Sequence, residues 1–186
     1  MAGCCRVHQG GWATTLTLLN EYAYLTFVTK GSSVMIQAGT PAPDFTLKNQ
    51  FGEEVVLSSF RGVKPVVLVF FPLAFSGICT GELCEIRDNL GVFADSNVEL
   101  FGVSVDSHFT QRAFAESQNY DFNLLADFWP HGAVADAYGV FLAEAGIANR
   151  ATIVIDKDGV VAASFVTAPG QAREFAAYRE ALNALS

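Results

Sequence analysis

The chain has 186 residues, of which 51% are hydrophobic and 16% are charged, and its formal net charge at pH 7 is −8. This length is sufficient for one well-buried domain. The acidic balance argues against a nucleic-acid partner, because binding to a phosphate backbone depends on clustered lysine and arginine. A membrane partner is not expected either. No apolar run reaches the roughly 18 residues of a spanning helix, since residues 15–28 are interrupted by Asn20 and Glu21.

The four cysteines are unevenly placed, at Cys4, Cys5, Cys79 and Cys84. Such a small and uneven set is not a disulfide framework and predicts a reducing, cytoplasmic compartment. The first residues carry one arginine and no clean apolar stretch before a small-residue cleavage site. We therefore expect no signal peptide.

Residues 1–34 differ from the rest of the chain, because they show no sustained hydrophobic period. We interpret them as an N-terminal extension that is poorly ordered or results from an upstream start codon, and residues 35–186 as the domain. The extension contains Cys4, Cys5 and His8. Adjacent cysteines with one histidine lack the usual spacing of zinc ligands, so we expect no metal site.

From Met35 onward the pattern becomes regular. Residues 42–60 alternate apolar and polar side chains on either side of Asn49–Gly52, which predicts a hairpin. Residues 66–71, VVLVFF, are an unbroken apolar run rich in β-branched residues. Such a run is typical of a strand buried on both faces. A helix is expected to follow over residues 77–88.

The middle of the chain predicts further elements of both kinds. Ser107 is a candidate cap for a helix in which Phe109, Ala113 and Phe114 recur at helical spacing. A short helix is expected to end at Gly139. We expect a strand, a helix, a strand and a short helix at residues 98–106, 107–120, 122–127 and 131–140, respectively.

The last elements are a hairpin and a closing helix. Residues 151–156 and 160–166 flank Lys157–Gly159, a turn signal. An amphipathic helix is expected to begin near Pro169. Its apolar stripe consists of Phe175, Tyr178, Leu182 and Leu185. Alternating strands and helices followed by a hairpin predict one α/β domain, a mixed sheet with helices on both faces.

Cys79 occupies a position that favours a reactive thiolate. With Ser76 as N-cap, Cys79 is the third residue of the helix, where unpaired backbone N–H groups and the helix dipole favour a thiolate over a thiol. Pro72 ends the preceding strand, because it has no N–H to donate. Thiolate formation alone does not supply an enzyme-like rate, so donors aimed at the charge developing on the substrate are also required.

Pro72-x-x-x-Ser76-x-x-Cys79-x-x-Glu82 resembles the signature of the peroxiredoxins, which are thiol peroxidases with a thioredoxin-like fold. The similarity extends from about Met35 to the C-terminus. It includes the stretches APDFTL, RD at 87–88 and AYGV at 137–140. FFPLAFSGIC, LADFWPHGAV and GIANRATIVID are most similar to the alkyl hydroperoxide reductase E branch known from actinobacteria.

The resemblance implies a role for each matching residue. Cys79 would be the peroxidatic nucleophile and would become a sulfenic acid. Ser76 and Arg150 would hold the peroxide oxygens, Pro72 would shield the thiolate from water, and Glu82 would orient Arg150. Serine at position 76 departs from the family's usual threonine. It lacks the methyl group that restricts the rotamer, so we expect looser positioning.

Cys84 departs from the actinobacterial branch and resembles the resolving cysteine of the bacterioferritin-comigratory or Q-type peroxiredoxins. In an α-helix, residues five apart have Cα atoms roughly 8.6 Å apart, whereas a disulfide requires less than about 7 Å. A Cys79–Cys84 disulfide therefore requires local unwinding, which Gly81 would ease. The alternative is that Cys84 is a small buried residue and that an external thiol resolves Cys79.

The resemblance implies reduction of hydrogen peroxide, organic hydroperoxides and peroxynitrite by a protein that needs no cofactor. The expected reductant is thioredoxin, a mycoredoxin with mycothiol, or a glutaredoxin, and a homodimer is expected. A thioredoxin-like disulfide reductase is an alternative, but it would carry CxxC where this chain has CxxxxC. A non-enzymatic redox sensor that uses the sulfenic acid as a signal is the other alternative.

Overall fold

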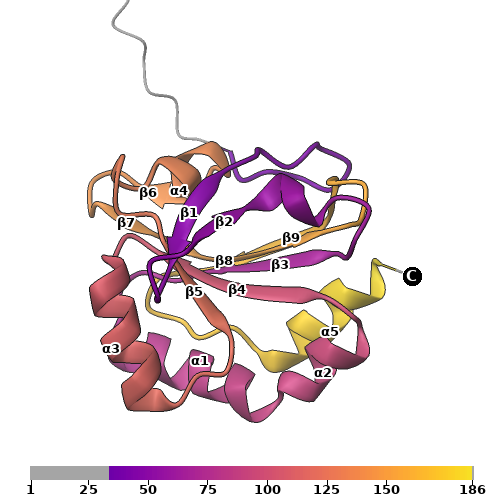
Figure 1. Ribbon diagram of the computed structural model, residues 1–186. Coiled ribbons are helices and arrows are strands. Elements are labelled where there is room, and N and C mark those ends of the chain that lie inside the picture. The colour runs from indigo at the N-terminus through magenta and orange to yellow at the C-terminus, as the bar shows by residue number, and fades with distance from the viewer. Residues whose placement is uncertain (1–33, 186) are drawn as a thin grey trace, which may run out of the picture. The chain divides into compact units, whose positions relative to one another are not determined.

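The computed structural model describes residues 34–185 (Figure 1). The predicted extension lies outside the described residues except for Val34, so its character stays a prediction. Within residues 34–185, no helix is long and apolar enough to cross a membrane.

A seven-stranded sheet forms the centre of the domain, with strand order β2-β1-β5-β4-β3-β8-β9. A separate two-stranded ribbon consists of β6 and β7. The strands are β1 (Thr46–Asn49), β2 (Glu54–Val56), β3 (Val66–Phe70), β4 (Glu99–Ser104), β5 (Asn123–Ala126), β6 (Phe141–Leu142), β7 (Ile147–Ala148), β8 (Arg150–Ile155) and β9 (Val161–Thr167). The helices are η1 (a 3-10 turn, Leu57–Phe60), α1 (Gly77–Asp88), α2 (Leu90–Asp95), α3 (His108–Gln118), α4 (Ala133–Ala137) and α5 (Phe175–Asn183).

The sheet is mixed, as predicted. β3, β4 and β5 are parallel, whereas β1 is antiparallel to β5, and β8 is antiparallel to both β3 and β9. Every residue of β3 is buried, which explains the unbroken apolar run in its sequence. Side chains of β3 alternate between two apolar cores, one on each face of the sheet.

Helices cover both faces, but unequally. Residues of α1, α2, α3 and α5 share one core with β3, and Figure 1 shows these four helices together on one side of the sheet. Residues of α4 belong to the other core, together with residues of β1. The prediction of helices on both faces is confirmed.

The cap of α3 is confirmed, but its predicted apolar stripe is partly wrong. The Ser107 hydroxyl accepts a hydrogen bond from the Thr110 N–H at 3.2 Å. Phe114 is fully buried, whereas Phe109 is 73% exposed and Ala113 is also exposed. The buried face instead begins at Gln111, whose side chain finds hydrogen-bond partners inside the protein. A polar residue therefore occupies a core position that the apolar pattern could not reveal.

The closing helix begins later than predicted. α5 begins at Phe175, not near Pro169, because the intervening residues are used for interior contacts. The Pro169 carbonyl accepts a hydrogen bond from Arg150, and Arg173 is buried in the domain. The expected stripe does pack: Tyr178 and Leu182 are buried in the core shared with α1.

The end of α4 depends on Gly139, as predicted. Gly139 has a φ of +68°, and a Cβ there would lie 2.2 Å from the Val34 carbonyl oxygen. Only glycine tolerates both the left-handed backbone and this close approach. The backbone of Val34 and Met35 thus passes too close to Gly139 for any side chain at that position.

Candidate active site

The first turn of α1 forms as the sequence predicted. α1 begins at Gly77 with Ser76 as its N-cap in extended conformation, so Cys79 is the third helical residue. The Ser76 hydroxyl does not cap the helix but donates a hydrogen bond to the Leu73 carbonyl at 3.1 Å. Pro72, two residues after the end of β3, is buried. Cys79 therefore lies at the edge of the sheet where parallel strands end, a common place for functional groups.

Cys79 is a free thiol and is fully buried, at 0% exposure. It belongs to the apolar core that contains Phe71 and Leu83. Among the described residues, its sulfur makes no hydrogen bond to another side chain. Neither Ser76 nor Arg150 is therefore hydrogen-bonded to the sulfur in this conformation, and Cys79 is not in contact with solvent.

Glu82, one turn further along α1, is the centre of a buried ionic cluster. Its carboxylate accepts a hydrogen bond from Nη1 of Arg150, forming an ion pair whose side chains are at most 3% exposed. Arg150 is the first residue of β8, and its neighbour Ala151 pairs with Phe70 at the end of β3. The antiparallel β3–β8 register thus brings Arg150 to the turn that carries Cys79. The predicted pairing of Glu82 with Arg150 is present.

Arg173 completes the cluster and was missed by the sequence analysis. Its backbone N–H and its Nε both donate to Oε1 of Glu82, at 2.7 and 3.0 Å, and its Nη2 lies 3.3 Å from Oε2. Its Nη1 donates to the carbonyls of Phe70 and Ala151 at 3.0 and 2.9 Å. No local pattern identifies this residue, because its partners are about 20 to 100 residues away in the chain.

Cys84 lies on the same unbroken helix as Cys79 and is a free, partly buried thiol. Its sulfur is 3.6 Å from Oε1 of Gln118 and 3.8 Å from the hydroxyl of Tyr120. Burial, reinforced by the contact with Cys84, raises the pKa of the Tyr120 phenol, which therefore stays neutral. Because α1 is continuous, the two cysteines are not within disulfide reach in this conformation.

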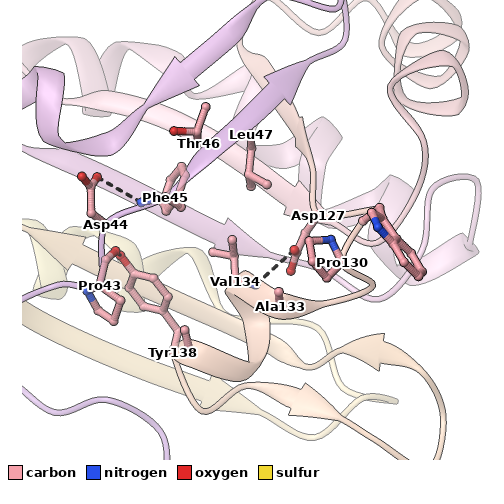
Figure 2. A pocket seen from close by; sticks show the side chains of 12 residues that line it. Pro43, Asp44, Phe45, Thr46, Leu47, Asp127, Pro130, Ala133, Val134 and Tyr138 are labelled. Carbon is pink, nitrogen blue, oxygen red and sulfur yellow. Dashed lines mark hydrogen bonds between the residues drawn. The ribbon is translucent and has the colours of Figure 1, made fainter.

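A cavity of about 250 Å³ lies elsewhere, between β1 and α4 (Figure 2). It contains none of the predicted site residues. Asp127, at the end of β5, lines it and accepts hydrogen bonds from the backbone N–H groups of Val134 and Ala135. Burial raises the pKa of the Asp127 carboxyl. Both carboxylate oxygens are thus occupied in capping α4, a structural role.

Comparisons with known proteins agree with this architecture. Residues 38–164 match the AhpC/TSA family. Alkyl hydroperoxide reductase E of Mycobacterium tuberculosis is 46% identical over 152 residues, which cover 82% of this chain and 99% of that protein. Peroxiredoxin Q, chloroplastic, of Sedum lineare is 35% identical over 161 residues, covering 83% of this chain and 77% of that protein.

Solved structures show the same fold. The crystal structure of peroxidoxin BcpB from Mycobacterium tuberculosis superimposes with a TM-score of 0.68 at 32% identity, covering 81% of this chain and 96% of that one. The reduced 2-Cys peroxiredoxin of Plasmodium vivax gives a TM-score of 0.73 at 28% identity, covering 80% of this chain and 81% of that one. The family match and the fold together show that this chain is a peroxiredoxin of the AhpC/TSA family.

Proposed function

We propose that Cys79 is the peroxidatic residue of this thiol peroxidase. The observation that carries the proposal is the buried cluster of Glu82, Arg150 and Arg173. Its carboxylate, Glu82, lies one turn beyond Cys79 on α1. Cys79 is the cysteine of residues 34–185 at a helix N-terminus, whereas Cys84 lies mid-helix.

The charges in the cluster do not cancel. One carboxylate and two guanidinium groups, all at most 4% exposed, leave one positive charge in excess. An uncompensated buried charge is costly, and a thiolate on the preceding turn would compensate it. Residues three apart on a helix face have Cβ atoms about 5–6 Å apart, so Cys79 lies on the same face of α1 as Glu82, with which both arginines are paired. The helix N-terminus acts in the same direction.

The chemistry follows from that thiolate. The sulfur of Cys79 attacks one peroxide oxygen, the O–O bond breaks, and the other oxygen leaves as an alkoxide or hydroxide that then takes a proton. The sulfur is oxidised to a sulfenic acid and the peroxide is reduced to an alcohol or water. We assign stabilisation of the leaving oxygen to Arg150 and Ser76, since guanidinium and hydroxyl groups donate to a developing anion. Glu82 fixes the orientation of Arg150, and buried Pro72 keeps water from the sulfur.

Access requires movement of the residues over Cys79. Leu73 and Ile78, which precede Cys79 in sequence, are 41% and 38% exposed. Exposed apolar side chains in a short segment contribute little to holding it closed. We propose that these side chains move aside to admit peroxide while the first turn of α1 stays folded. After oxidation, the turn unwinds so that Cys84 attacks the sulfenic sulfur, releasing water and forming a disulfide.

The recycling step and the assembly complete the proposal. A small dithiol protein of the thioredoxin, mycoredoxin or glutaredoxin type would reduce the disulfide. We propose a homodimer, supported by the exposed aromatic residues Phe109 and Trp129, which are 73% and 81% exposed. Light scattering of the purified protein tests the dimer, and a monomeric mass at micromolar concentration would contradict it.

Peroxide consumption with dithiothreitol tests the central assignment. Wild type and Cys84→Ser are expected to turn over, because dithiothreitol can replace the internal thiol, and Cys79→Ser is expected to be inactive. Turnover that survives in Cys79→Ser rules out the assignment. A single oxidation without turnover in the wild type would favour a redox sensor.

Mass spectrometry tests the role of Cys84. Peroxide-treated wild type is expected to show a peptide pair linked through Cys79 and Cys84. If the oxidised protein instead carries a sulfenic acid that only added thiol removes, an external thiol resolves Cys79.

A further inference from the structure

A chain of hydrogen-bonded polar side chains connects the loop between β3 and α1 to neighbouring elements of the fold. The Ala74 N–H donates to Oδ2 of Asp106 at 2.8 Å, and the Ser104 hydroxyl donates to the same oxygen at 2.7 Å. Nε2 of Gln111 donates to the Ser104 hydroxyl at 3.1 Å and to the Leu125 carbonyl at 2.7 Å. The chain of bonds thus runs from the interior, through α3 and β4, to the loop that precedes Cys79.

The inner members of this chain are buried at a cost. Ser104 and Gln111 are both 0% exposed, and Oε1 of Gln111 has no hydrogen-bond partner. A buried polar atom without a partner destabilises the fold. An apolar residue at position 111 would avoid that cost. The Gln111 amide donates to the Ser104 hydroxyl, which is thereby directed to Asp106, and this arrangement costs stability in the core.

The loop itself needs such an anchor. Phe75 has a φ of +61°, in the left-handed region that is unfavourable for a residue with a Cβ. Its ring packs against Phe114 of α3 with centroids 4.9 Å apart. The Ala74 bond to Asp106 and the ring contact of Phe75 both tie the loop to the β4–α3 segment. A strained conformation persists only where the surroundings hold it in this way.

We propose that Asp106, supported by Ser104 and Gln111, is a positioning residue that latches the Cys79 turn in its folded, peroxide-reactive conformation. The inference rests on the proposed role of Cys79. Two steps of that role need opposite conformations. Attack on peroxide needs the first turn of α1 intact, and disulfide formation with Cys84 needs it unwound. The strength of the latch therefore sets the balance between the two steps.

Thiol labelling measures the latch without any peroxide chemistry. Cys79 is fully buried, so a bulky reagent such as dithiobis(nitrobenzoic acid) can react with it only when the first turn of α1 is unfolded. The labelling is done in a background of Cys4→Ser, Cys5→Ser and Cys84→Ser, in which Cys79 is the remaining thiol. Asp106→Ala removes a charged acceptor of two bonds and is expected to raise the labelling rate roughly 10- to 100-fold. Gln111→Leu replaces a buried polar side chain by an apolar one and is expected to raise the labelling rate by a smaller factor.

With Cys84 present, Asp106→Ala is expected to slow the reaction of Cys79 with peroxide and to speed disulfide formation from the sulfenic acid. A merely structural role would slow both steps together. Asp121→Ala is the matched control, because Asp121 is exposed and makes no side-chain hydrogen bond to the described residues. It should leave labelling and both rates at wild-type values.

Labelling and rates within twofold of wild type in both Asp106→Ala and Gln111→Leu would overturn the latch, as would changes of both steps in the same direction. If Asp106→Ala does not fold, Ser104→Ala and Gln111→Leu decide by the same criteria. A wild-type Cys79 that does not react with peroxide would contradict the proposed function, but the labelling comparison would still test the latch.

Discussion

Replacing Glu82 by glutamine perturbs the ionic cluster with little change of volume. The variant removes the carboxylate that pairs with both Arg150 and Arg173, although both arginines are at most 3% exposed. It also presents an amide NH₂ to guanidinium donors. Leaving a buried charge uncompensated costs about 3–5 kcal/mol. At about 2–4 °C per kcal/mol for a domain of this size, the melting temperature should fall by roughly 6–20 °C.

The same substitution is expected to slow the reaction with peroxide, because Arg150 loses the carboxylate that orients it. Loss of one preorganised donor costs roughly 10²–10³-fold in rate, and misorientation should cost about tenfold or more. The assays are denaturant unfolding and stopped-flow oxidation by hydrogen peroxide under conditions where the variant is fully folded. Rates measured there separate the chemical effect from the stability effect.

Glu85→Gln is the matched control. Glu85 is three residues further along α1 and is exposed, so the substitution should change the unfolding free energy by at most about 0.5 kcal/mol. Combining Glu82→Gln with Arg173→Met should show a coupling of at least about 1 kcal/mol, since the two side chains are in direct contact. An unfolding free energy of Glu82→Gln equal to that of Glu85→Gln would refute the account of the cluster.

Three further outcomes are expected. Burial raises the pKa of the Asp127 carboxyl, so the folded state binds a proton more tightly than the unfolded state. The stability contributed by protonated Asp127 is therefore present in acid and lost as pH rises through the raised pKa. In denaturant unfolding, Asp127→Asn should lack this decrease of the unfolding free energy with rising pH. An unchanged pH dependence in the variant would contradict the assignment. Gly139→Ala should destabilise by at least about 1 kcal/mol because of its φ of +68° and the Val34 carbonyl, whereas Gly170→Ala, with open space around its Cβ position, should be close to neutral in the same unfolding assay. Ser76→Thr should raise the rate of peroxide reduction a few-fold by restricting the hydroxyl rotamer, and a slower variant would show that the serine is positioned in another way.

Much of the fold could be predicted because local patterns and tertiary structure agree. The helix expected over 77–88 is α1 with the same bounds, since Pro72 follows the end of β3 closely and Ser76 adopts the extended conformation of an N-cap. The strand expected over 66–71 is β3, because its apolar run leaves no alternative to burial on both faces. The pairing of Glu82 with Arg150 was implied by family resemblance and is confirmed in the structure.

What could not be predicted depends on contacts between distant segments. Arg173 was placed inside a helix by its amphipathic surroundings, but its guanidinium is directed to Glu82 and to strand carbonyls, and the helix begins only after it. Gln111 was hidden for the same reason, because a polar residue at a core position is recognisable only when its partners are known. The full burial of Cys79 also follows from packing between α1 and the sheet, which no local pattern encodes.

The most direct test is to locate the sulfenic acid after a single equivalent of peroxide. In full-length Cys84→Ser, dimedone added during oxidation should be found on Cys79 by peptide mass spectrometry, with the oxidation faster than that of free cysteine. Dimedone absent from Cys79, or an oxidation no faster than that of free cysteine, would contradict the claim that the excess positive charge of the Glu82, Arg150 and Arg173 cluster activates this sulfur.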